Sequence, residues 1–248
     1  MLEIFALRLA VGMLVALLLL PVVEVPPRFY RLHLLIALGL VTLAGVSADR
    51  NDSPVYWFGL GLAGAGCFVG TWFWMGEANR LGLLPIVLAA GAGTLALLSE
   101  AIGEASDVPS LLVIGFEHAS SALQLGLVLT AMLLGHYYLI APSMTTRPLV
   151  RLTVLLLGAN LVRAVIVASN EVAWLYSPAG SAIASEQWLW LVLRWLGGIA
   201  AAAMFSFLAW RCARLRATQS ATGILYAAVI CTFLGELAHL LVHTRTAP

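Results

Sequence analysis

Long apolar stretches follow one another along the whole chain, separated by short segments that hold proline, glycine and charged residues. A helix that crosses a bilayer needs roughly 20 consecutive apolar residues, so the pattern predicts about eight transmembrane helices. Their approximate ranges are 3–23, 32–48, 55–75, 81–101, 110–136, 149–171, 188–210 and 219–242. Proline marks three of the predicted starts, because Pro54, Pro109 and Pro148 stand just before them. The GxxxG spacing of Gly66 and Gly70 predicts a helix-packing face within the third span.

The composition agrees with this pattern. Hydrophobic residues make up 62% of the 248 residues and charged residues only 10%, whereas a soluble domain carries about 25% charged residues. We therefore expect an all-α, polytopic membrane helix bundle that forms a single transmembrane domain over residues 1–248. The segments between the spans are short, which leaves no room for a soluble catalytic domain. The first span lacks the features of a cleaved signal, and we expect it to be retained.

The charges between the spans predict the orientation. Arginines concentrate in the loops after the odd-numbered spans: Arg28, Arg31, Arg80, Arg147, Arg151, Arg211, Arg214 and Arg216. The loops after the even-numbered spans and the C-terminal tail contain only Arg50 and Arg245. Basic loops stay on the cytoplasmic side, so this bias predicts that both termini are extracytoplasmic. The expected location is a bacterial-type inner membrane, with the lipid bilayer as the surrounding phase.

Seven ionisable side chains interrupt the apolar stretches, and with this orientation all fall in the extracytoplasmic half. They are Arg8, Glu117, His118, Arg163, Arg194, Glu236 and His239. Burying a charge at mid-membrane costs at least ~2.5–3.5 kcal/mol, so such residues indicate a functional site. Glu117, Arg163 and Glu236 are therefore candidate catalytic groups. The alternative is a set of ion pairs that clamp helices together. Arg8 and Arg194 either bind an anionic group or extend to the interface.

The histidines separate by depth. His118 and His136 lie on one face of the fifth span, because eighteen residues make five turns, about 27 Å of helix. His118 with His239 or His243 forms an outer pair, and His136 with His33 forms an inner pair. Imidazoles at two depths predict axial ligands of two stacked b haems, with His118 and His239 on the outer haem iron. Arg8, Arg163 and Arg194 would then neutralise propionates or a quinone oxygen. The alternative places His33, His136 and His243 as interfacial anchors.

The placement of His118 and His136 and the helix count resemble those of the membrane cytochrome b and quinone-interacting subunits of respiratory oxidoreductases. This resemblance implies haem b and quinone as cofactors, other subunits in a membrane complex, and an extracytoplasmic redox partner. The chain would then be an electron-transfer subunit of a respiratory or photosynthetic-type oxidoreductase.

Two other functions stay open. A proton-coupled transporter would use Glu117, His118, Arg163 and Glu236, although the sequence shows no convincing repeat between residues 1–124 and 125–248. A scaffold subunit would need no cofactor. Three isolated cysteines, with no CxxC or CxxCH, indicate neither a zinc site nor covalent haem. Nucleotide and hydrolase motifs are absent, and no basic patch indicates nucleic acid.

Overall fold

A computed structural model describes residues 1–48, 53–75, 80–141, 144–175 and 185–246 of the chain. Within these ranges the protein is all-helical, as the sequence predicts. Its elements are α1 (Leu2–Leu18), α2 (Pro27–Ser47), α3 (Pro54–Phe73), η1 (Arg80–Gly82), α4 (Leu83–Glu104), α5 (Val108–Ile140), α6 (Arg147–Leu175), α7 (Ser185–Val192), η3 (Leu193–Ala201), α8 (Ala202–Arg214) and α9 (Thr218–Thr246). Segments α7, η3 and α8 follow one another without a break and form one long rod.

Seven of the helical segments are long and apolar enough to cross a membrane, so the chain is a multi-pass membrane protein. Helix α1 does not belong to this group, since it ends at Leu18 after 17 residues. The predicted end of the first span at residue 23 is wrong. Continuing α1 to residue 23 would put Pro21 inside the helix, where a proline removes a backbone hydrogen bond. The count of eight spans stays a prediction.

The predicted start of the second span, residue 32, is also late by five residues. Helix α2 begins at Pro27, whose fixed backbone angle suits the first helical position. Arg28 and Arg31 therefore lie in its first turns and not in a loop. Hydrophobicity marks the part of a helix that lies in lipid, and polar first turns extend beyond it. Helix α5 also runs beyond its predicted end at residue 136, as far as Ile140.

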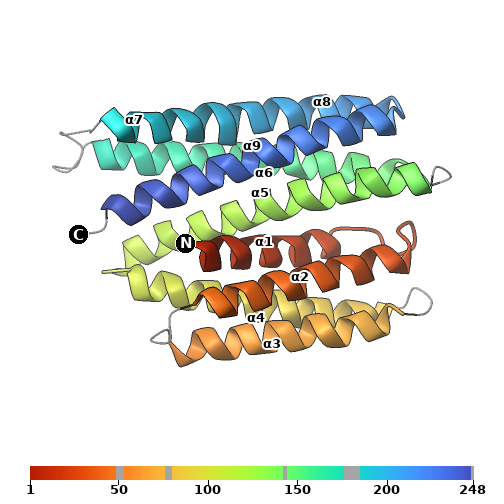
Figure 1. Ribbon diagram of the computed structural model, residues 1–248, viewed down its shortest axis with the longest axis horizontal. Helices are drawn as coiled ribbons and strands as arrows, with labels where there is room; N and C mark the ends of the chain where they lie inside the picture. Colours follow the sequence, from red (N-terminus) through yellow and green to blue (C-terminus); the bar gives the residue numbers. More distant parts are fainter. Residues whose placement is uncertain (49–52, 76–79, 142–143, 176–184, 247–248) are drawn as a thin grey trace.

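The helices form two four-helix halves with the same order of neighbours (Figure 1). In the first half, α1 and α3 each pack against α2 and α4. In the second half, α5 and α8 each pack against α6 and α9. Both halves start at the same end of the bundle, where α9 also ends (Figure 1). The architecture thus repeats although the sequences of the two halves show no convincing repeat. Packing of this kind requires small and apolar residues at contact positions, which different sequences supply.

Helices α1 and α5 join the two halves at a crossing of two glycines. A Cβ atom on Gly12 would lie 1.7 Å from the carbonyl oxygen of Ala122, and one on Gly126 would lie 1.9 Å from the carbonyl carbon of Gly12. Only glycine permits this approach of two backbones. The predicted packing face of α3 is confirmed, since a Cβ on Gly66 would meet the Cβ of Ala89 on α4 at 3.0 Å.

A capping box fixes the start of α5, the helix that is central to the site. The Asp107 side chain accepts a hydrogen bond from the Ser110 amide at 2.9 Å, and the Ser110 hydroxyl accepts one from the Asp107 amide. Hydrogen bonds from Ser110 also lower the pKa of the Asp107 carboxyl below its ordinary value. Glu117 and His118 follow about three turns further along the same helix.

Candidate functional site: a charge network beside an apolar cavity

Three arginines and three glutamates meet inside the bundle, toward the end where α1 begins. We call this set, with two histidines, the charge network: Arg8, Glu117, His118, Arg163, Glu171, Arg194, Glu236 and His239. All are buried except Glu171, whose side chain keeps 19% of its surface exposed. The structure therefore brings together all seven ionisable residues that the sequence places in the extracytoplasmic half.

Glu117 on α5 forms one centre of the charge network. Its Oε1 accepts from the Arg194 Nη2 at 3.0 Å, from the His239 Nε2 at 2.9 Å and, more weakly, from the Arg163 Nη1 at 3.4 Å. Its Oε2 accepts from the Asn170 side-chain amide at 2.9 Å. Both carboxylate oxygens are thus engaged, by groups from α6, η3 and α9.

Glu236 on α9 forms the other centre. Its Oε2 accepts from the Arg163 Nη2 at 3.1 Å, and its Oε1 pairs with the Arg8 guanidinium. Arg163 therefore bridges the two carboxylates, while Arg8 brings α1 of the first half onto α9 of the second. With three arginines facing three glutamates, the formal charges of these six residues balance. This balance, together with dense hydrogen bonding, is what a buried ionic cluster requires in order to be tolerated.

Glu171 is a member of the charge network that sequence reasoning did not select. It accepts from the Arg194 Nη1 at 3.2 Å and from the indole N–H of Trp195. Glu171 lies eight residues after Arg163, which is about two turns along the same face of α6. That spacing is the sequence signal that relates Glu171 to Arg163.

The π-helical segment η3 shapes this side of the network. A π-helix is wider than an α-helix and often occurs at functional sites. Here the carbonyl oxygen of Gly198 accepts from the Gln124 side chain at 3.2 Å, and the same amide donates to Asn160 at 2.7 Å. Asn160 in turn donates to Ser206 at 3.0 Å. These polar side chains extend the polar interior of the bundle beyond the charge network. A small cavity of about 10 Å³ lies between Gln124 and the charge network.

His118 occupies a different position from the other members, at the edge of the charge network. The Nε–H of Arg8 donates to the Nδ1 of His118 at 3.1 Å. An arginine only donates, so Nδ1 is the acceptor, and a neutral imidazole with this partner carries its proton on Nε2. The Nε2 atom is buried and has no hydrogen-bond partner in the described part of the chain. His118 therefore has a buried N–H donor that no described residue satisfies.

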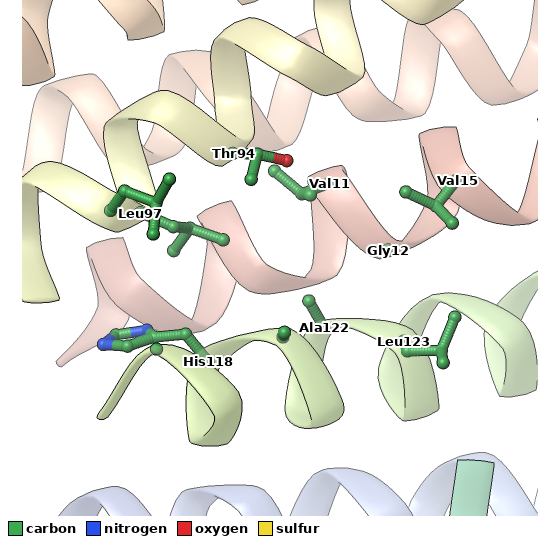
Figure 2. A pocket seen from close by; sticks show the side chains of 11 residues that line it. Val11, Gly12, Val15, Thr94, Leu97, His118, Ala122 and Leu123 are labelled. Carbon is green, nitrogen blue, oxygen red and sulfur yellow. The ribbon is translucent and has the colours of Figure 1, made fainter. Parts of the chain in front are cut away.

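An apolar cavity of about 260 Å³ adjoins His118 (Figure 2). It lies between α4 and α5 with α1 behind it, and His118 is at one end of the row of lining side chains, with Val15 and Leu123 at the other (Figure 2). Leu98, which also lines it, is 45% exposed. In a transmembrane bundle such an exposed side chain faces lipid, so the cavity opens sideways into the membrane between α4 and α5.

The inner histidines have separate surroundings. His33 is buried, its Nδ1–H donates to the Phe29 carbonyl oxygen of its own helix at 3.0 Å, and its ring lies against the Phe29 ring. His136 is exposed and contacts the Tyr226 hydroxyl on α9 at 3.4 Å. The two residues thus have different neighbours, on α2 and α9. The side chain of His243 is outside the described part of the chain.

In comparisons with known proteins, no family model, curated protein or solved structure matches the chain.

Proposed function

We propose that this protein is a membrane subunit of a redox complex and binds a quinone in the cavity between α4 and α5. The observation that carries the proposal is that His118, one of the residues that line the apolar cavity, has a buried Nε2–H donor without a hydrogen-bond partner among the described residues. Leaving such a donor unsatisfied costs about 1–3 kcal/mol. A quinone carbonyl oxygen would accept from it, and the ring and its isoprenoid tail would lie against the apolar lining.

The lateral opening supports a ligand that arrives from the lipid phase. A water-soluble substrate would have to cross hydrocarbon in order to reach this entrance, whereas a membrane quinone already resides there. The cavity volume of about 260 Å³ lies just below the range of small-molecule pockets, roughly 300–1,000 Å³. Thr94 adds a hydroxyl to the lining, although that hydroxyl donates to the Ala90 carbonyl at 2.8 Å.

A bound quinone would supply two-electron, two-proton redox chemistry, in which quinone is reduced to quinol and quinol is oxidised in the reverse direction. The electrons would come from, or go to, an extracytoplasmic partner subunit. His118 holds the ring oxygen, and Arg8 orients the imidazole through its Nδ1. Because arginine stays protonated, the link from Arg8 to His118 positions the ring but passes no proton. Glu236 fixes Arg8 in turn.

The sequence also predicts haem b, and the residues fit it less well. A haem held by two histidines needs imidazoles on both sides of the iron. Among the residues that line the cavity, His118 supplies the one imidazole, while the Nε2 of His239 contacts Glu117. No mechanistic step is therefore assigned to haem. A reduced-minus-oxidised spectrum of protein produced with haem supplied tests this prediction, and sharp α and Soret bands would restore it.

A proton-coupled transporter remains the second proposal because of one observation, the repeated four-helix halves. Parallel repeats occur in some carriers, with the substrate site between the halves. The charge network does include Arg8 from the first half. Flux of protons or substrate in proteoliposomes would favour the transporter, and a scaffold would show neither flux nor quinone binding.

A pair of glycine variants tests the quinone proposal. A Cβ on Gly115 would have no heavy atom within 4 Å, and this residue lines the cavity. A side chain can therefore start there without a clash, and Gly115→Phe is the variant designed to fill the cavity. Gly91 on α4 also has nothing within 4 Å but lies outside the lining, so Gly91→Phe is the matched control.

The measurement is equilibrium binding of a short-chain ubiquinone and menaquinone analogue to purified protein. We expect Gly115→Phe to weaken binding at least about tenfold, equivalent to ~1.4 kcal/mol, and Gly91→Phe to match the unsubstituted protein. Equal binding by all three proteins, or no binding by the unsubstituted protein, would remove the proposal.

A further inference from the structure

A second hollow lies at the opposite end of the bundle, between the start of α6 and the end of α8. Its volume is about 510 Å³. Three arginines border it, namely Arg147 and Arg151 on α6 and Arg214 on α8. Three apolar side chains complete most of its lining: Val150, Val154 and Leu155. The hollow therefore combines a strongly basic rim with an apolar floor.

The three guanidinium groups have no carboxylate partner within the described ranges. All three residues are exposed, and Arg214 lies over the Trp210 ring at 5.1 Å from its centroid. A nearby carboxylate, that of Glu24, accepts from the Thr145 hydroxyl at 2.6 Å. Three like charges around one hollow repel each other, and an anion placed between them would relieve this repulsion.

The apolar floor of the hollow indicates a ligand that has an apolar part in addition to an anionic group. Val154 is 48% exposed although it lies within the apolar part of α6, about two turns from the helix start. Arg147 and Arg151 are one turn apart, so both project over the same side of α6 as Val150 and Val154. A ligand with an anionic head and a hydrocarbon tail would contact both parts of this surface, whereas a phosphate ion would contact the arginine rim alone.

We propose that this hollow binds an anionic phospholipid of the surrounding leaflet. The phosphate accepts hydrogen bonds from Arg147, Arg151 and Arg214, since guanidinium groups bind phosphate in a two-point geometry. One acyl chain lies along Val150 and Val154. Basic pockets between transmembrane helices are known settings for lipid headgroups. This site is separate from the charge network and does not depend on the proposed quinone function.

The test uses the full chain in detergent, titrated with phosphatidylglycerol or phosphatidylcholine and observed by native mass spectrometry. The double variant R147Q/R151Q removes two rim charges. Its matched control is R28Q/R31Q, which removes two exposed arginines from the first turns of α2 at the same end of the bundle (Figure 1). Each surface arginine contributes about a fivefold factor to binding of an anionic lipid.

We expect R147Q/R151Q to weaken phosphatidylglycerol binding by about 30-fold and R28Q/R31Q to leave it nearly unchanged. Val154→Trp fills the floor and keeps every charge, so it should also weaken lipid binding. Inorganic phosphate at the same concentrations should not compete. Equal loss in the two double variants would overturn the proposal, as would unchanged binding in Val154→Trp or full competition by phosphate, which would indicate a free-anion site.

Discussion

Each buried carboxylate of the site is held by more than one cation. The sequence was sufficient to identify the ionisable residues, because a charge within an apolar stretch is conspicuous. Ion pairs between helices were the alternative interpretation of these residues, and Arg163 does pair with Glu117 and Glu236. The pairing of Arg8 with Glu236 was not predictable, since it depends on how α1 and α9 approach one another in space.

Arg163 bridges Glu117 and Glu236, and only 3% of its side chain is exposed. Arg163→Gln leaves Glu117 and Glu236 with less compensation in a low-dielectric interior. Breaking a buried pair in this way costs about 3–5 kcal/mol. The measurement is the free energy of unfolding in mixed micelles, with the exposed Arg28→Gln as the control. If both variants unfold at the same denaturant concentration, the network does not stabilise the fold.

Helix ends and helix contacts were predictable to different degrees. Apolar stretches located every helix, but they placed the ends of the first and fifth spans several residues away from Leu18 and Ile140. The π-helical turn of η3 had no visible sequence signal beyond the Gly197–Gly198 pair. Glycine spacing within α3 predicted a packing face correctly. The closest crossing, at Gly12 and Gly126, involves single glycines on helices far apart in the sequence, so no local motif reveals it.

The crossing of α1 and α5 at Gly12 and Gly126 can be tested by substitution. Gly12→Ala would place a methyl group 1.7 Å from the Ala122 carbonyl oxygen, so α1 and α5 must separate. Overpacking commonly costs about 1–3 kcal/mol, and a clash with backbone belongs at the upper end or beyond.

The control is Gly39→Ala on α2, where a Cβ would meet nothing within 4 Å. It should be neutral or stabilising by up to ~1 kcal/mol, because alanine favours helix. Thermal unfolding of the purified variants measures both effects. A Gly12→Ala protein as stable as the Gly39→Ala protein would contradict the close crossing of α1 and α5.

The whole molecule is two four-helix halves joined along α1 and α5, with the charge network between them at one end and the arginine-lined hollow at the other. The start of α1 and the end of α9 lie together (Figure 1). The positive-inside bias predicts that this end is extracytoplasmic, which would place the charge network in the outer half of the membrane.

Reporter fusions test that orientation. Alkaline phosphatase is active only outside the cytoplasm, and green fluorescent protein fluoresces efficiently when folded inside it. We expect a C-terminal phosphatase fusion to be active and a C-terminal fluorescent fusion to be dark, with the reverse for fusions inserted after Arg216. Fluorescence at the C-terminus would invert the membrane orientation and place the charge network on the cytoplasmic side.

The repeat of the two halves and the partners of each helix were beyond the reach of sequence reasoning. Hydrophobicity shows that a helix is in the membrane but not which helices surround it. The cavity was equally hidden, since its lining comes from α1, α4 and α5 and includes mostly small and aliphatic residues. His118 was the one member of the lining that the sequence had singled out. The sequence predicts it as a paired haem ligand, and the structure shows its Nδ1 bonded to Arg8.

The most direct test of the central claim is infrared difference spectroscopy of a quinone labelled with ¹³C at a carbonyl and bound to the purified protein. A hydrogen bond from the Nε2 of His118 should lower the stretching frequency of one carbonyl relative to the free quinone. His118→Phe keeps a ring of similar size without the donor and should return that frequency to its free value. A carbonyl frequency that is the same in both proteins would contradict the assignment of His118 as the donor in a quinone site.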